Sequence, residues 1–97
     1  MVVLQNPVLE QVIQSLGFKD SETFLKIQAQ SLLLQKIAYY HGQIDLFVKK
    51  YGGNYEIFIN RFNEYPQSLI EKEEDGQDWD DAIDFVNIYQ QRLQEIL

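Results

Sequence analysis

The 97-residue sequence predicts an all-α fold built around one long helix over about residues 20–51. Three observations point to it: apolar residues spaced alternately by four and three, polar residues able to cap helices, and two adjacent glycines after residue 51. The apolar series is Leu33, Ile37, Tyr40, Ile44, Phe47 and Tyr51. At about 1.5 Å per residue this helix would measure roughly 48 Å. A chain of this size cannot bury such a helix along its whole length by itself, so we expect the helix to need packing partners.

Three shorter helices are predicted around it. The first covers about residues 7–16, because Asn6 can accept hydrogen bonds from free amides and Pro7 already has helical φ. Gly17 is suited to end this helix in the left-handed conformation. Asp20 or Ser21 would then cap the long helix.

The third helix is predicted over about residues 55–64, after a cap at Asn54 and before Pro66. The last helix is predicted over about residues 79–96, with Asp78 as its cap after a break at Gly76-Gln77. Its apolar residues step by three and four: Trp79, Ala82, Val86, Tyr89, Leu93 and Ile96.

The apolar series of the long helix and that of the last helix each form a seam along one side of the helix. These two seams predict a helical hairpin or bundle that can dimerise. The long helix and the last helix could lie antiparallel within one chain, mate with copies of themselves, or pack against another protein. If copies mate, the oligomer interface would be formed by Leu33, Ile37, Tyr40, Ile44 and Phe47. Residues 1–97 are expected to form a single helical domain, with an acidic connection at about residues 64–81.

The charge balance favours a protein partner. The formal net charge is -7 and the pI is near 4.5, so direct binding to nucleic acid is not expected and a basic protein is the natural complement. Cysteine is absent, which fits a reducing compartment. The apolar run at residues 1–4 is too short for a signal peptide, and no run is long enough to span a membrane. These features predict a cytoplasmic protein.

No catalytic or metal-binding motif is evident. His41 is the single histidine, and the segment Asp75-Gly76-Gln77-Asp78-Trp79-Asp80 lacks the residue order of an EF-hand calcium loop. The sequence contains no nucleophile elbow, phosphate loop or dinucleotide fingerprint. We therefore expect neither enzymatic activity nor a cofactor or metal.

The segment from Glu64 to Asp84 is the most polarised part of the chain, with nine carboxylates against one cation, Lys72. Trp79 stands among these carboxylates and could anchor an interface, because a large ring beside charges offers apolar area and electrostatic steering. Equally, Trp79 could be a core residue and the charge run a solvated face. The predicted partner-binding residues are Trp79, Asp78, Asp80, Asp81, Glu71, Glu73, Glu74 and Tyr89.

The stretch Lys50-Tyr51-Gly52, followed by an aromatic-acidic segment and by Asp78-Trp79-Asp80-Asp81-Ala82, resembles the small acidic antitoxins of prokaryotic type II toxin-antitoxin modules. The closest likeness is to the antitoxins that pair with RelE-like mRNA interferases, the TumA type among them. The resemblance covers about half of the chain and includes no helix-turn-helix. It implies a binding protein that masks the cationic RNA-binding surface of a small RNase toxin. The alternative is a helical self-assembly or adaptor module that has no toxin partner.

Overall fold

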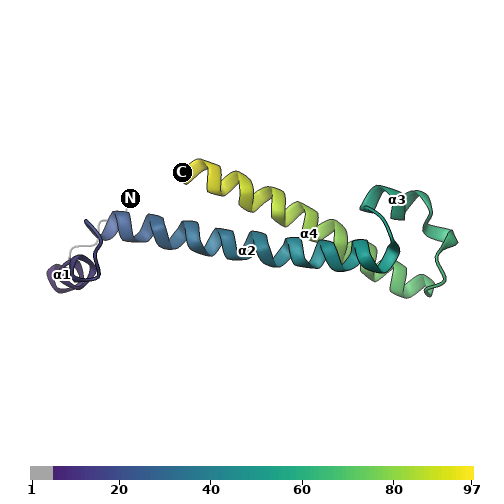
Figure 1. Ribbon diagram of the computed structural model, residues 1–97, viewed down its shortest axis with the longest axis horizontal. Coiled ribbons are helices and arrows are strands. Elements are labelled where there is room, and N and C mark those ends of the chain that lie inside the picture. The colour runs from purple at the N-terminus through teal and green to yellow at the C-terminus, as the bar shows by residue number, and fades with distance from the viewer. Residues whose placement is uncertain (1–5) are drawn as a thin grey trace.

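The computed structural model describes residues 6–97 as four α-helices and one short 3-10 helix, with no strand in that range (Figure 1). The prediction of an all-α fold with one long central helix is confirmed. Residues 1–4, read above as too short for a signal peptide, lie outside the described residues. The elements are α1 (Pro7–Ser15), α2 (Ser21–Tyr51), α3 (Tyr55–Asn60), the 3-10 helix η1 (Phe62–Glu64) and α4 (Leu69–Ile96).

The predicted caps at the start of the chain are present. The Asn6 side chain accepts hydrogen bonds from the amides of Val8 and Leu9, both at 3.1 Å, and Pro7 is the first helical residue of α1. Gly17 has a φ of 96°, so it turns the chain in the left-handed conformation that glycine adopts without strain.

The long helix α2 begins and ends where the sequence predicts. The Asp20 carboxylate accepts a hydrogen bond from the Thr23 amide at 2.8 Å, and this bond lowers the pKa of Asp20. At the other end, Gly52 has a φ of 76° and its amide donates to the Val48 carbonyl at 2.8 Å. Lys49 and Lys50 lie in the last turn, where cations interact favourably with free carbonyls.

The last helix differs from the prediction at its start. It begins at Leu69, with Ser68 as its cap, so most of the expected acidic connection over residues 64–81 is helical and Asp78 lies inside α4. Of the carboxylates in this segment, Glu71 lies in the first turn of α4, where the positive end of the helix favours an anion. Gly76 therefore does not break the helix. Its missing side chain leaves room for the Phe58 ring of α3, since a Cβ atom at this position would lie 3.2 Å from Phe58 Cε2.

Helices α2 and α4 form an antiparallel hairpin, and α3 lies at its closed end (Figure 1). The core sits at that end, where Tyr51, Phe58 and Trp79 are buried. Phe58 and Trp79 have ring centroids 5.3 Å apart, and Trp79 stacks on Phe47 at 5.6 Å. The molecule measures 62 × 21 × 20 Å, so most of its length is a two-helix rod.

Over residues 6–97, none of the helices combines the length and the apolar character that a membrane span requires.

The contact between Gly76 and Phe58 can be tested with matched substitutions. Gly76→Gln should lower the free energy of unfolding by about 1–3 kcal/mol, because the new side chain would enter space filled by a buried ring. Gly42→Gln is the control, since Gly42 lies inside α2 and a Cβ atom there would meet nothing within 4 Å. It should raise stability by a few tenths to about 1 kcal/mol through helix propensity. Equal effects of the two changes in urea unfolding would show that the close contact is absent.

Candidate interaction surface

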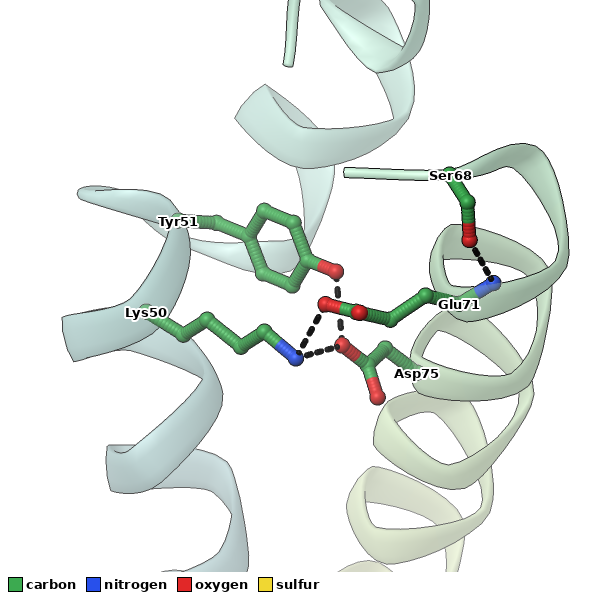
Figure 2. A network of polar contacts seen from close by, with 5 residues as sticks. All are labelled: Lys50, Tyr51, Ser68, Glu71 and Asp75. Carbon is green, nitrogen blue, oxygen red and sulfur yellow. Dashed lines mark hydrogen bonds and ion pairs between the residues drawn. The ribbon is translucent and has the colours of Figure 1, made fainter. Parts of the chain in front are cut away.

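A polar network joins the end of α2 to the first turns of α4 (Figure 2). The Lys50 ammonium lies 2.6 Å from Oδ2 of Asp75 and 2.8 Å from Oε2 of Glu71. The Tyr51 hydroxyl donates a hydrogen bond to the same Asp75 oxygen at 2.6 Å. One carboxylate thus receives a charged and a neutral donor from consecutive residues of α2, which fixes the register between the two helices.

The network changes the acid-base behaviour of its donors. Hydrogen bonds to Asp75 and then to Glu71 raise the pKa of Lys50 above its ordinary value, because they favour the ammonium form. Burial raises the pKa of Tyr51, and the hydrogen bond and negative charge of Asp75 raise it further. Both shifts favour the protonated donors, so the network is intact at neutral pH and joins α2 to α4 at the closed end of the hairpin.

Trp79 lies in the core of the hairpin. Its side chain is 0% exposed and packs against rings from α2 and α3, including Tyr51 and Tyr55. The interpretation of Trp79 as a core residue is thus confirmed, and its prediction as a surface anchor is wrong for the folded chain. Trp79 is the first residue of the apolar seam of α4. Burying its indole removes a large apolar area from water, and this gain in free energy places the ring in the core although its neighbours in the sequence are charged.

The carboxylates beside Trp79 face away from that core. Glu73, Glu74, Asp78 and Asp81 are exposed and Asp80 is half-buried. The ion pairs within residues 6–97 involve only Glu71 and Asp75, both with Lys50, and Glu95 with Arg92. The outer surface of α4 therefore carries carboxylates that no cation of the described chain neutralises. We call this set of carboxylates the acidic face of α4; its members are the exposed Glu73, Glu74, Asp78, Asp81 and Asp84 and the half-buried Asp80.

The one cation within this acidic stretch is turned inward. Lys72 is buried, and its ammonium donates hydrogen bonds to the backbone carbonyls of Phe62 at 2.9 Å and Tyr65 at 3.4 Å. It also lies 4.8 Å from the centroid of the Phe62 ring, a cation-π contact. Lys72 thus fastens the η1 segment to α4, and its inward position leaves the outer surface more acidic than the sequence composition alone suggests.

The predicted oligomer interface is occupied by α4 of the same chain. Tyr40 stacks on Phe85 at 4.9 Å and on Tyr89 at 6.1 Å, and Ile44 and Phe47 pack against the core cluster. Leu33 and Ile37 are half-buried along the same seam. Among the three packings that the sequence left open, the structure has the one within a single chain, and Tyr89 serves it as a packing residue.

His41 is exposed on α2, and no group of three His, Asp or Glu side chains among residues 6–97 is placed to hold a metal ion.

One feature of α2 was not predicted from the sequence. A second apolar series follows a strict seven-residue spacing and stays exposed: Leu25, Leu32, Tyr39 and Leu46. A seven-residue spacing of apolar side chains indicates a packing surface on a helix. The four-three seam beside it contains more residues, so the sequence favours that seam as the packing surface of α2.

Ionisation of the Tyr51 phenol tests the polar network. Folding raises the Tyr51 pKa above the ordinary value of about 10, so its stabilising contribution is complete below that pH and is lost as the pH rises through the folded-state value. We expect Asp75→Asn to move the Tyr51 pKa downward, because a negative acceptor no longer opposes the phenolate. Ultraviolet titration of phenolate absorbance measures this shift. The titration step that is lost in the Tyr51→Phe variant belongs to Tyr51. Coincident titrations of native and Asp75→Asn proteins would show that Asp75 has no part in it.

The residues that carry the resemblance to antitoxins lie together at the closed end of the hairpin, where α2 turns into α3 beside the first half of α4. The Lys50-Tyr51-Gly52 turn contributes to the polar network, and the Trp79 segment contributes the core and the acidic face. Comparison of the chain with protein-family models, with curated proteins and with solved structures finds no match.

Proposed function

We propose that this chain is a binding protein without catalytic activity, which uses the acidic face of α4 to cover a cationic surface of a partner protein. The observation that carries the proposal is the exposure of these carboxylates without neutralising cations, on a helix held rigidly by a buried aromatic core. In line with the resemblance to antitoxins, the class of partner that fits best is a small RNase toxin.

The chemistry of such a partner supports this choice. An RNase must present a cationic surface to the phosphates of RNA. A helix with carboxylates on its outer side competes for that surface and also excludes RNA sterically. Opposite charges speed the encounter of the two proteins, and salt weakens this effect. Glu73, Asp80 and Asp84 are spaced by seven and four residues, so they project from one side of α4 as a row.

The buried position of Trp79 changes how this function must be tested. Trp79→Ala would remove a fully buried ring and is expected to cost about 3–5 kcal/mol of stability. A loss of binding in that variant would therefore report unfolding. Glu71 and Asp75 are also unsuitable, because their loss would disturb the network with Lys50.

A second candidate function is a helical self-assembly or adaptor module. The exposed apolar series of α2 favours it, since side chains as large as Leu32 and Tyr39 lie more than half exposed along a helix. Asp78 and Asp81 of the acidic face also line a groove between α2 and α4 together with Tyr39, so dimerisation through that groove would cover part of the acidic face.

We expect a small basic protein to co-purify with the tagged chain from its native source at low salt and to be released by a salt step. With that protein purified, Glu73→Gln/Asp84→Asn should slow association and flatten its salt dependence, as measured by stopped-flow or surface-based kinetics. Glu22→Gln/Asp45→Asn is the matched control, because it removes the same charge from α2. Equal slowing by both pairs, or recovery of no basic protein, would contradict the proposal.

A further inference from the structure

The exposed apolar series of α2 is long and regular. Leu25, Leu32, Tyr39 and Leu46 are 51%, 59%, 54% and 60% exposed. Residues seven apart lie almost above one another on an α-helix, so the four side chains form a single stripe of about 32 Å. This stripe is distinct from the seam that contacts α4, and the described chain places no helix over it.

Helix α4 extends the stripe into a two-helix surface. Tyr39 contacts Tyr40 at 4.9 Å between ring centroids, and Tyr40 stacks on Phe85 of α4 at 4.9 Å. A groove between the helices is lined by Tyr39, Gln43, Asp81 and Phe85, among others. Ile88, one turn beyond Phe85, is 47% exposed. We call this surface the Tyr39 face; its apolar members are Leu25, Leu32, Tyr39, Leu46, Phe85 and Ile88.

The amount of exposed surface points to association. A compact chain of this length has a radius of gyration of about 12–13 Å, whereas this chain has 20.1 Å. A folded monomer of 11.5 kDa exposes about 5,800 Å² by the usual scaling with mass, whereas this chain exposes 7187 Å². The excess of about 1,400 Å² is larger than the roughly 800 Å² that each partner buries in a standard protein interface.

The charges of the two helices favour a second copy as the occupant. Apart from Lys50, Glu71 and Asp75, which pair within the chain, α2 carries three lysines against Glu22 and Asp45, and α4 carries seven carboxylates against Lys72 and Arg92. When two hairpins meet through the Tyr39 face with their two-fold axis along the rods, each α2 lies on α4 of the other copy. Unlike charges then flank an apolar centre. The other two-fold arrangement, with α2 on α2, would bring the carboxylates of the two α4 helices together.

We propose that the chain forms a two-fold symmetric dimer through the Tyr39 face, a four-helix bundle in which α2 of each copy packs against α4 of the other. This inference deepens the self-assembly candidate and does not depend on the acidic-face proposal. It replaces the interface expected from sequence, because Leu33, Ile37, Tyr40, Ile44 and Phe47 already pack within the chain. Two-fold dimers are the commonest homo-oligomers, and their closed symmetry covers such a surface without open-ended assembly.

Sedimentation equilibrium over a range of concentrations tests the dimer. The native chain should sediment with twice the mass of the 11.5 kDa monomer. Leu32→Glu should yield monomers, because it places a carboxylate in both halves of an apolar interface. Leu34→Glu is the matched control: Leu34 is 55% exposed on the same helix but lies beside the opposite groove, with Ile37 and Leu93. It should leave the dimer intact, and circular dichroism should show unchanged helicity in both variants.

A native chain that stays monomeric at every concentration would overturn the proposal, as would equal dissociation of the Leu32→Glu and Leu34→Glu variants.

Because the chain lacks cysteine, disulfide trapping tests the arrangement of the helices. Lys36 lies one turn from Tyr39, and Ile88 lies one turn from Phe85 at a similar level of the rod. Lys36→Cys chains mixed with Ile88→Cys chains should form a linked pair on mild oxidation. Linkage only between identical chains would contradict the packing of α2 on α4. These readouts use no basic partner, so their outcome is separate from that of the acidic-face proposal.

Discussion

The packing of Trp79 against Phe58, Tyr51 and Phe47 is the contact on which the rest of the molecule depends. It joins α2, α3 and α4 at one point, and the hairpin has its largest fully buried side chains there. Farther along the hairpin the seam between the two long helices buries only the smaller side chains of Ala82 and Val86, and its other members are half-buried. The aromatic cluster therefore sets the crossing of the helices, and through it the direction in which each outer surface points.

Two surfaces of different chemistry result from that arrangement. The acidic face of α4 suits a cationic protein, and the Tyr39 face suits an apolar one. Both are made of side chains that lie outside the buried aromatic core. The buried Lys72 and the paired Lys50 show how the cations near α4 are used: they stabilise the fold and leave the outer carboxylates without partners.

Local signals in the sequence were sufficient for the helix ends that depend on neighbouring residues. Asn6, Asp20 and Gly52 mark such ends because their roles are decided by a few adjacent backbone groups. The start of α4 also has a local signal, because Ser68 and Glu71 have the spacing of a capping box, but the prediction placed a break at Gly76. The role of Gly76 inside the helix depends on Phe58, which is distant in the sequence. Whether Trp79 and the α2 seam pack within the chain or against another protein depends on which surface covers them. Periodicity reveals a buried stripe but does not name its partner, so the sequence left Trp79 open between an interface anchor and a core residue, and the structure places it in the core.

The shape of the hairpin also bears on the order in which it forms. At the closed end Tyr51 meets Asp75 across 24 residues, whereas at the open end the Gln30 side chain meets the Ile96 carbonyl across 66 residues. Joining distant residues costs more chain entropy than joining near ones, so the aromatic end can close first and bring the remaining turns of α2 and α4 together in sequence. By the same reasoning the hairpin is expected to fray from the Gln30 end, where no buried ring opposes its separation.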